Sequence, residues 1–418
     1  MFRRRLAWRS VAVLGAAALM LAACADDGDD EPEGGNGDQF EGTFTLGVIL
    51  PQTGGLASFG EGMIAATEMA VEEINENGGV WGNDVQTIIQ DEGPAEEPEV
   101  VQSAADAMIS QGANAVIGAA SSTSSLNIIE TLFNQKIIQI SPSNTGPDFT
   151  GHQYGDYYFR TAPSDVLQGS ALAEVIAENG QESIAILAQQ TAYGEGLANQ
   201  VEEVFTAAGG EVTAKEFYDL TQTEYSSEAQ ALAASDPDGI LLVSYEESVQ
   251  IIPALVAAGV GPQDTQWYFV DGNHLDYSED FDPGFMEGVI ASQPGAEEEP
   301  TDFYNRIDEF RAGLPERVYT PESYDATIVV ALAAIAANTD DPDAIRDEMS
   351  AVVQGGTVCG TFAECRDLLA EGEDIDYDGV TGPISWTEDG DPGEATIGIY
   401  EYGGENTTTR IDSRVGQM

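Results

Sequence analysis

The chain has very few basic side chains. Only 14 of its 418 residues are Lys or Arg, whereas 74 are Asp or Glu, so the formal net charge at pH 7 is −60. Nucleic-acid binding depends on Lys and Arg that neutralise phosphates, so this composition excludes it as a main activity. The same shortage of positive charge argues against adhesion of the folded part to an anionic membrane surface.

Apolar residues, by contrast, are numerous enough to build a core. Hydrophobic residues make up 42% of the chain and aromatic residues 8%, so the acidity does not indicate disorder. The length indicates about two to three domain-sized units. Acidic residues are spread along the chain, and the lysines are limited to Lys136 and Lys215. This pattern is typical of a protein that works in concentrated salt, where the Debye length shrinks to ~3 Å at 1 M. A merely acidic exported protein is the alternative.

The N-terminus has the pattern of an export signal. Four arginines within the first nine residues precede an apolar run from Ser10 to Ala23. The run is shorter than the ~20 residues that cross a membrane, but it suits the core of a signal peptide. It ends in Leu21-Ala22-Ala23-Cys24, which resembles the lipobox of bacterial lipoproteins. The resemblance implies that residues 1–23 are removed and that Cys24 is lipidated; an ordinary signal peptide with an incidental cysteine is the alternative.

The segment after the signal is predicted to be a flexible tether. Residues 25–42 read ADDGDDEPEGGNGDQFEG, with almost nothing to bury, so their like charges keep them extended. We therefore assign 24–42 to the lipidated cysteine and an acidic linker, which holds the folded part outside the membrane. No other segment is predicted to span a membrane. Without residues 1–23 the chain has 10 basic and 74 acidic residues, a net charge of −64.

Cysteine and histidine are too scarce for a metal site. Besides Cys24 there are only Cys359 and Cys365, six residues apart, and neither of the two histidines has metal-ligand spacing. In an exported domain such a pair predicts a small-loop disulfide, with two reduced buried thiols as the alternative. Asp374-x-Asp376-x-Asp378-Gly resembles the start of a calcium loop, but Ser385 stands where a bidentate Glu is required. We therefore expect no metal.

Short apolar strands alternate with amphipathic helices in two successive series. This βαβ pattern implies parallel sheets, so the sequence predicts an α/β protein with two doubly wound α/β lobes. The first series has predicted strands at 43–50, 85–90, 115–118 and 137–140, with helices that end near residue 77 and cover 100–111 and 126–134. The second series has predicted strands at 183–188, 211–217, 239–244 and 266–270, and helices at 168–178, 194–208 and 249–258. Helices are predicted from 301 to 353, notably at 321–338, and strands and turns from 375 onwards.

Ligands of open α/β sheets bind at the loops beyond the carboxyl ends of the strands. In the first series the candidate loops are 51–60 (PQTGGLASFG), 119–125 (AASSTSS) and 141–145 (SPSNT). In the second series they are 189–193, 244–247 and 271–274. None of the first three loops contains a histidine, so a hydrolase with a nucleophile–base pair is not expected there.

The loop AASSTSS carries the clearest chemistry. Ser122 and its neighbours stand at a predicted helix N-terminus, where free N–H groups and the helix dipole favour an anion. Hydroxyl groups add donors without charge, so a carboxylate can be held there without Lys or Arg. Asp271 and Glu246 in the other lobe are candidates to pair with an ammonium group, as a zwitterionic amino acid requires. For Ser122 and Thr123, helix capping alone is the alternative.

Several stretches of the sequence resemble one protein family. In order, they are LGVILPQTGGLASFG, AVEEINENGGVWG, AVIGAASSTSS, QISPSNT, YYFRTAPSD, AYGEGLANQV and ESYDA. In these stretches the chain is similar to the type I periplasmic binding proteins, specifically the leucine/isoleucine/valine-binding receptors of ABC importers. The resemblance implies two lobes joined by a multi-segment hinge, a Venus-flytrap that closes on its ligand. The lobe boundaries that we predict are 43–161 and 292–382 for lobe 1, and 162–291 and 383–418 for lobe 2.

The resemblance also implies roles for single residues. Ser122 matches the serine whose hydroxyl and amide bind the ligand carboxylate. Ser143 and Thr145 match the pair that completes recognition through backbone and hydroxyl groups. Tyr193 and Tyr245 match aromatic residues that the second lobe supplies.

An acid and two further aromatic residues complete the implied site. Asp271 falls where the family places an acid for the α-ammonium group, and Phe59 and Tyr319 fall at aromatic positions along the cleft. For each aromatic residue, packing in the core of a lobe is the alternative. Two positions depart from the family pattern, since the acid is Asp rather than Glu and Ser121 stands in place of a cysteine. These departures leave the ligand open between a branched-chain amino acid, an amide, urea and an aromatic acid.

From these features we expect a solute-binding protein rather than an enzyme, with no cofactor and no metal. We expect it to act as a monomer that binds a small molecule and delivers it to ABC permease subunits with cytoplasmic ATPases. The lipid anchor at Cys24 is expected to hold it on the outer face of the cell membrane. A ligand-sensing protein is the second possibility, although neither a transmembrane helix nor a fused signalling domain is predicted.

Overall fold

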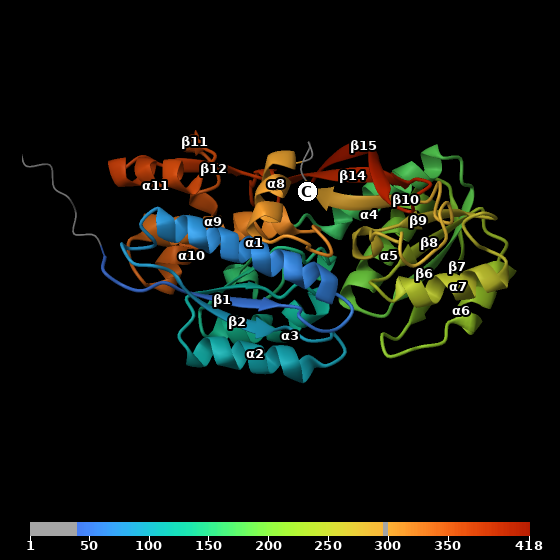
Figure 1. Ribbon diagram of the computed structural model, residues 1–418, viewed down its shortest axis with the longest axis horizontal. Coiled ribbons are helices and arrows are strands. Elements are labelled where there is room, and N and C mark those ends of the chain that lie inside the picture. The colour runs from blue at the N-terminus through green and yellow to red at the C-terminus, as the bar shows by residue number, and fades with distance from the viewer. Residues whose placement is uncertain (1–39, 296–299) are drawn as a thin grey trace, which may run out of the picture. The chain divides into compact units, whose positions relative to one another are not determined.

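Two mainly parallel β-sheets, with helices on both faces, organise the described part of the chain (Figure 1). The computed structural model describes residues 40–295 and 300–418. The predicted signal peptide, Cys24 and nearly all of the linker lie outside the described residues. Phe40–Met418 form one compact unit. Within the described ranges, no helix has the length and apolarity needed to cross a membrane.

The first sheet contains five parallel strands in the order β2-β1-β3-β4-β5. Its strands are β1 (Thr45–Leu50), β2 (Gln86–Asp91), β3 (Ala115–Gly118), β4 (Ile138–Ser141) and β5 (Tyr158–Arg160). Its helices are α1 (Ala57–Glu76), α2 (Pro98–Ser110), α3 (Ser122–Asn134), α8 (Thr301–Phe310), α9 (Thr320–Ala337), α10 (Pro342–Ala351) and α11 (Phe362–Glu371). Two short 3-10 helices, η1 (Pro147–Phe149) and η2 (Gly155–Tyr157), precede β5, and β11 (Thr357–Cys359), β12 (Ile375–Gly379) and β13 (Gly382–Pro383) form a small separate sheet. Helices α1 and α9 cover one face of the five-stranded sheet, and α2 and α3 cover the other (Figure 1).

The sequence of β1 shows why this sheet needs helices on both faces. Side chains along a strand point alternately to opposite faces. Val48 and Leu50 belong to the same apolar cluster as Met63 of α1, whereas Ile49 belongs to a different cluster with Met108 of α2. A strand that is apolar on both faces is stable only where both faces are covered, as in parallel sheets with crossover helices.

The second sheet has the order β15-β14-β10-β9-β8-β6-β7. Its strands are β6 (Ser183–Gln189), β7 (Glu211–Tyr218), β8 (Gly239–Val243), β9 (Gln266–Phe269), β10 (Ile290–Gly295), β14 (Glu394–Tyr402) and β15 (Thr408–Gln417). Its helices are α4 (Asp165–Glu178), α5 (Ala192–Ala207), α6 (Ser226–Ala234) and α7 (Ser248–Ala258), with the short η3 (Asp271–Asn273) after β9. The strands from β6 to β10 are parallel, while β14 and β15 are antiparallel at one edge. Ile186 shares an apolar cluster with Leu197 of α5, and Leu187 shares another with Ile251 of α7, so helices cover this sheet on both faces as well.

The predicted fold class, two doubly wound α/β lobes, is confirmed. The strands and helices of both predicted series are present, with some ends displaced. Helix α3 begins at Ser122 rather than at residue 126 because the side chain of Ser121 caps it, and α4 begins at Asp165 because Ser164 caps it.

Five elements were not predicted from the sequence: β5, α6, β10, β11 and α11. Strand β5 has only three residues, too few to show a period of two. Strand β10 contains Pro294, a residue that normally argues against a strand inside a sheet. This strand also continues past the predicted lobe boundary at residue 291 and pairs with β14 as far as Gly295.

A buried ion pair holds the C-terminal crossover against lobe 1. Arg160 at the end of β5 and Asp391 ahead of β14 are fully buried, with 2.6 Å between Nε and Oδ1. The Arg160 guanidinium also donates to the carbonyl oxygens of Asn144 (3.1 Å) and Gly146 (2.8 Å). The Arg160 carbonyl in turn accepts a hydrogen bond from the Trp386 indole at 2.7 Å. One side chain therefore fixes both the loop after β4 and the segment that leads to β14.

The two C-terminal cysteines and the acidic segment after them have structural roles. Cys359 and Cys365 are joined in a disulfide with 5.3 Å between their Cα atoms. The Asp-rich segment that resembles a calcium loop largely forms β12 instead. Among the described residues, no three His, Cys, Asp or Glu side chains are grouped to hold a metal ion.

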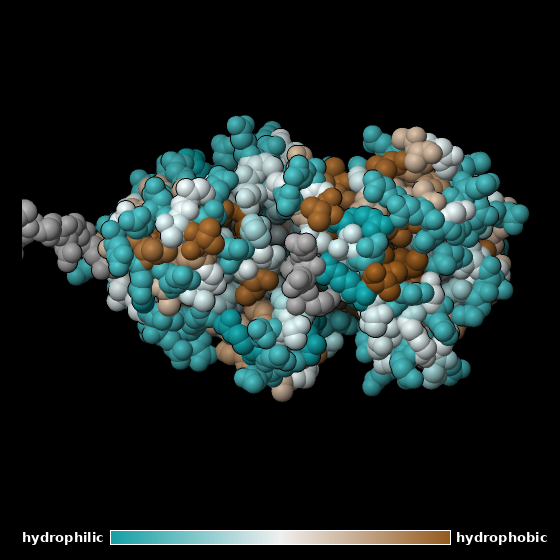
Figure 2. All heavy atoms as spheres, turned by 90° about the horizontal axis from the view of Figure 1, so that it is seen from above, coloured by the Kyte–Doolittle hydropathy of each residue, from teal (hydrophilic) through white to brown (hydrophobic). Residues whose placement is uncertain are grey.

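Hydrophilic residues cover most of the face shown in Figure 2, and apolar residues form separate groups on it. Only a few large apolar side chains are exposed in the described part of the chain: Val256, Val358, Ile411, Val415 and Met418. Such single exposed residues are normal on a folded protein. The acidic composition is thus accommodated at the surface while the interior remains apolar.

We expect Asp391→Ala to lower the free energy of unfolding by about 3–5 kcal/mol, because it leaves Arg160 buried without its partner. Asp389→Ala is the matched control, since Asp389 is exposed on the same segment. The control should change stability by no more than about 0.5 kcal/mol. Urea unfolding in concentrated salt measures both values, and equal losses in the two variants would refute this role of the ion pair.

Candidate ligand-binding site

The two sheets direct equivalent loops toward the same place. The parallel strands have the same order in both lobes, β2-β1-β3-β4-β5 in the first and β7-β6-β8-β9-β10 in the second. Strand order reverses beside β1 and beside β6, and such switch points are where α/β sheets bind ligands. The segments that follow β1 and β3 in lobe 1, and β6 and β8 in lobe 2, line one common cavity.

This inner cavity contains most of the predicted site. Its empty volume is about 320 Å³, and seven of the nine predicted ligand-binding residues line it. Lobe 1 supplies Phe59, Ser122, Ser143 and Tyr319, and lobe 2 supplies Tyr193, Tyr245 and Asp271. The rest of the lining consists of Leu56, Met63, Ala120 and Gly272. The lobes also touch each other directly, since the amide of Ala192 donates to Thr123 Oγ1 at 3.2 Å.

Asp271 is the electrostatic centre of the inner cavity. Its carboxylate accepts hydrogen bonds from the hydroxyl groups of Tyr193 (2.7 Å) and Tyr319 (2.6 Å) and from the amide of Gln168 (2.9 Å). Burial raises the pKa of Asp271, and these hydrogen bonds counteract the rise. Because Tyr319 precedes α9 and Tyr193 lies at the start of α5, this one carboxylate connects both lobes.

Two tyrosines of lobe 2 form a flat wall of the cavity. The rings of Tyr193 and Tyr245 are stacked, with centroids 5.5 Å apart and an angle of 11° between their planes. Both residues also belong to the apolar core of lobe 2, so they contribute to packing and to the cavity at once. Gly272 lies against them: a Cβ at this position would be 2.9 Å from the Tyr193 hydroxyl and 2.6 Å from the carbonyl oxygen of Ser244.

Ser121 rather than Ser122 caps α3. The side chain of Ser121 accepts the capping hydrogen bond, and its amide donates to Glu92 at 2.9 Å. The Ser122 hydroxyl lines the inner cavity and accepts from the amide of Gly146 at 3.2 Å, which leaves its own proton available to a ligand. Within the described residues, the amide of Ser122 has no acceptor. The capping alternative therefore applies to Ser121, and Ser122 keeps two donors for an anion.

Ser143 and Thr145 are placed differently. Ser143 lines the inner cavity, and its hydroxyl donates to the carbonyl of Ala120 at 3.2 Å. Thr145 is buried outside the lining, and its carbonyl accepts from the amide of Asp165 at 2.7 Å. Only Ser143 of this pair is positioned to touch a ligand in the inner cavity, while Thr145 lies beside an acid that the sequence analysis did not consider.

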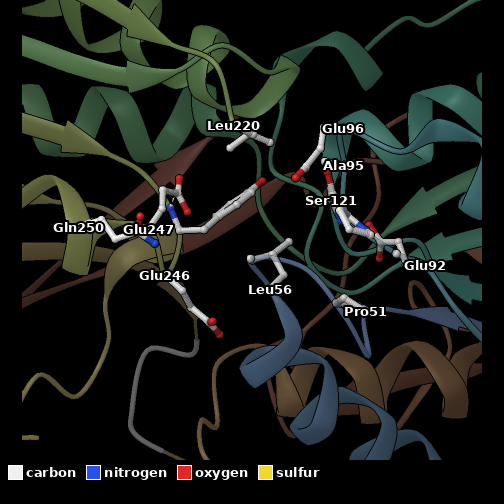
Figure 3. Close-up of a pocket in the computed structure, with 14 residues that line it drawn as sticks. Pro51, Leu56, Glu92, Ala95, Glu96, Ser121, Leu220, Glu246, Glu247 and Gln250 are labelled. Carbon is white, nitrogen blue, oxygen red and sulfur yellow. Dashed lines mark hydrogen bonds between the residues drawn. The ribbon is translucent and has the colours of Figure 1, made fainter. Parts of the chain in front are cut away.

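A larger, acidic cavity adjoins the inner one. The two cavities share Leu56 and Tyr245, and the outer one has an empty volume of about 800 Å³. Figure 3 shows acidic side chains on opposite sides of Leu56 in this outer cavity: Glu92 and Glu96 from lobe 1, Glu246 and Glu247 from lobe 2. The outer cavity therefore has a strongly negative lining.

Two of these acids, Glu246 and Glu92, already accept hydrogen bonds from backbone amides. Glu246, a candidate ammonium partner, lies here rather than in the inner cavity and accepts from the amide of Ser58 at 3.1 Å. Glu92 accepts from the amides of Ala120 (2.7 Å) and Ser121 (2.9 Å), and burial raises its pKa to about 7. Because Glu92 already occupies two amides ahead of α3, an incoming anion is left with the donors of Ser122.

Three residues of this region were not predicted from the sequence: Glu92, Gln168 and Asp165. Glu92 directly follows β2, and the loop after that strand was not among the candidate loops. Gln168 was placed inside a helix without a role. Asp165 ends the matching stretch YYFRTAPSD, but an acid in the first turn of a helix is also expected from the helix dipole alone. Asp165 and Gln168 could have been recognised from their spacing of three residues, which puts them on the same face of α4.

Comparisons with known proteins agree with this geometry. A family profile described as periplasmic binding protein matches residues 43–404. The leucine-, isoleucine-, valine-, threonine- and alanine-binding protein of Pseudomonas aeruginosa is 25% identical over 378 residues, which cover 88% of this chain and 92% of that protein.

The fold is similar to a branched-chain amino acid transporter substrate-binding protein of Streptococcus pneumoniae in complex with isoleucine. The TM-score is 0.73 at 19% identity, and the match covers 90% of this chain and 100% of that one. It is also similar to an R. palustris solute-binding protein in complex with 4-hydroxybenzoate, with a TM-score of 0.73, 16% identity, and coverage of 90% and 98%.

Two lobes whose switch points face one shared cavity define a two-lobed ligand-binding protein. The chain belongs to the periplasmic binding protein family, and within it to the type I proteins of the branched-chain amino acid group. Members of this family are solute-binding proteins rather than enzymes. The family predicted from the sequence is thereby confirmed.

Gly272→Ala tests how closely the cavity wall is packed. We expect it to lower the free energy of unfolding by about 1–3 kcal/mol, because the new Cβ must displace the Ser244 carbonyl or the Tyr193 hydroxyl. Gly155→Ala is the control, since a Cβ at Gly155 meets nothing within 4 Å. Urea unfolding of both variants gives the comparison, and a Gly272→Ala protein as stable as the control would contradict the described packing.

Proposed function

We propose that this chain is the extracytoplasmic, lipid-anchored solute-binding protein of an ABC importer, and that it binds a branched-chain or related amino acid between its closing lobes. The observation that carries the proposal is the inner cavity, where the free donors of Ser122 in lobe 1 are opposite the carboxylate of Asp271 in lobe 2. A free amino acid carries one charge of each sign, so each end finds a partner. The amino acids in the name of the P. aeruginosa relative support this ligand class.

In the proposed mechanism the ligand carboxylate binds first to lobe 1, at Ser122 and Ser143. Lobe 2 then closes and brings Tyr193, Tyr245 and Asp271 onto the ligand. Only the closed state offers both sets of contacts, so the ligand shifts the equilibrium between open and closed states toward closure. The permease recognises the closed form and accepts the ligand from it.

The apolar part of the cavity fits the side chain of such a ligand. Leu56, Phe59 and Met63 form an apolar wall on lobe 1, and Tyr319 lies beside them. Phe59 and Tyr319 also belong to the apolar core of lobe 1. Ser121 and Thr145 act indirectly in this scheme, because one caps α3 and the other lies behind the cavity.

An aromatic acid is the alternative ligand that a specific observation favours. The stacked rings of Tyr193 and Tyr245 offer a flat surface, and the similar R. palustris protein is in complex with 4-hydroxybenzoate. An amide and urea are further alternative ligands, and ligand sensing without transport is an alternative role. No contact in the cavity favours any of them.

The same proposal covers the lobe boundaries, the anchor and the partners. We keep the predicted lobe boundaries at 161/162 and 382/383, but move the boundary after residue 291 to follow Gly295, because β10 belongs to the second sheet. Cys24 carries the lipid, the protein acts as a monomer, and ABC permease subunits with their ATPases receive the ligand.

Ser122→Ala should weaken amino-acid binding at least tenfold, because it removes a hydroxyl donor from a charged carboxylate. A thermal-shift screen of the standard amino acids, simple amides, urea and 4-hydroxybenzoate first identifies the ligand, since binding to the native state raises its stability. Calorimetry then gives the affinity of Ser122→Ala and of the control Ser103→Ala, which lies exposed on α2. A shift with 4-hydroxybenzoate and with no amino acid would favour the aromatic-acid alternative, and equal affinities in both variants would exclude Ser122.

Cys24→Ser should release the protein from the membrane. Without the thiol no lipid is attached, so the chain is expected in the soluble extracytoplasmic fraction, whereas the wild type sediments with membranes. Cell fractionation followed by immunoblotting measures the distribution. Cys359→Ser is the control, since Cys359 is in the disulfide with Cys365 and should not affect anchoring. Membrane attachment of the Cys24→Ser protein would exclude a lipid anchor at this residue.

A further inference from the structure

A second buried acid lies next to Asp271, and its carboxyl group has no part in the contacts described so far. Asp165, the first residue of α4, is fully buried and interacts electrostatically with Asp271. Neither of its carboxyl oxygens has a hydrogen-bond partner among the described residues. A buried carboxylate without donors costs several kcal/mol, so this group is not stable as an isolated anion in an empty site.

Other unpaired acceptors surround Asp165. Thr145 Oγ1 and Gln168 Oε1 are buried and also lack partners. The Gln168 amide donates to Asp271, and its oxygen lies on the same face of α4 as Asp165. The Thr145 hydroxyl lies beside Asp165, but even if it rotated to donate, it would satisfy one of the two carboxyl oxygens and leave the other unpaired. The cluster is therefore rich in acceptors and short of donors.

In the part of the chain that the structure describes, no cation is free to neutralise this cluster. Arg160 is the one cation that acts on Asp165 within the described ranges, and its guanidinium is already bonded to Asp391 and to two carbonyl oxygens. The other titratable groups that face one or both acids are tyrosines: Tyr193 from α5, Tyr245 after β8 and Tyr319 before α9. Glu322, in the first turn of α9, acts on Tyr319 and adds further negative charge. The missing positive charge must come from outside the protein.

We propose that Asp165 and Asp271 share one exchangeable cation, which is a proton in the empty site and the ammonium group of the ligand in the occupied site. This inference rests on the proposed amino-acid function of the cavity. When the ammonium group enters, the proton leaves the carboxyl pair for the solvent, so one proton is released for each ligand bound. The carboxyl pair together with its bound cation carries a charge of −1 in both states.

The exchange defines the class of ligand. An amino acid supplies the cation that the two carboxyl groups need. An acid without an amine, such as 4-hydroxybenzoate, brings only negative charge and leaves the proton in place. The site therefore selects ligands that carry an amine and rejects simple carboxylic acids.

The electrostatics of Asp165 give the sign of the pH dependence. Burial raises the pKa of Asp165 well above its usual range and the charge of Asp271 raises it further, whereas Thr145 and Arg160 lower it. A carboxyl whose pKa is raised on folding stabilises the protein at low pH, and this stabilisation is lost as the pH rises through the folded-state pKa. For an ammonium ligand the sign is opposite, because affinity rises with pH as fewer protons compete for the pair.

Calorimetry on the purified wild-type protein tests the exchange with three probes: L-leucine, its des-amino analogue 4-methylpentanoate, and 4-hydroxybenzoate. Titrations at several pH values from 5 to 8, in buffers of different ionisation enthalpy, give the affinity and the number of protons released. We expect L-leucine to release up to one proton and to bind up to about tenfold more tightly per pH unit below the pKa of the pair. We expect the two acids to bind at least 100-fold more weakly. Leucine binding that releases no proton and is equal at pH 5 and 8, or an acid that binds as tightly as leucine, would overturn the proposal.

Variants separate this role from a structural one. Asp165→Asn keeps the shape of the side chain, and we expect it to abolish proton release and to weaken L-leucine binding at least tenfold. Asp106→Asn, on the exposed face of α2, should behave as the wild type does. An Asp165→Asn protein that releases protons like the wild type would overturn the proposal. If this variant fails to fold, the wild-type titrations, which need no variant, decide the question.

The empty protein provides an independent readout. If none of the three probes binds, the proposed amino-acid function fails in the form tested, but the exchangeable proton is still measurable. Asp165→Asn should then melt at a higher temperature than the wild type at pH 8 and at the same temperature at pH 5. Equal melting temperatures at both pH values would overturn the proposal.

Discussion

Negative charge buried between the lobes is the constraint on which the rest of the site depends. Asp271 is tolerated because Tyr193, Tyr319 and Gln168 donate to it, and these donors come from both lobes. The arrangement in which the lobes are in contact is thus also the one that satisfies the carboxylate. A change in what occupies the cavity affects both lobes at once, which is the coupling that a closing binding protein requires.

The extreme acidity of the chain is compatible with binding a carboxylate because neutral groups supply the donors. The start of α3 offers the amide and hydroxyl of Ser122, and none of the described residues that line the inner cavity is a lysine or arginine. The deeply buried Arg160 has a different task, since it ties the loop after β4 to the crossover before β14. In the proposed function, the buried charges of the inner cavity select the ligand, and the acidic residues of the surface have no part in that selection.

The sequence allowed the fold and most of the cavity to be predicted because both follow from local patterns. Tyr193, Tyr245 and Ser122 stand just after strands, where the rule for parallel sheets places ligands. The features that could not be predicted depend on pairing between distant residues or on a local pattern with more than one interpretation. Arg160 and Asp391 are 231 positions apart, and no local pattern connects them. Asp165 looks like an ordinary acid at a helix start, and only the folded structure shows that its oxygens are buried without partners.

The most direct test of amino-acid binding between the lobes is a crystal structure grown with the amino acid that most raises the melting temperature of the protein. We predict that its carboxylate lies against the amide and hydroxyl of Ser122. Its ammonium group should lie within about 3 Å of a carboxyl oxygen of Asp271 or Asp165. A ligand in the reverse orientation, or one bound in the outer cavity beside Glu246, would contradict this account.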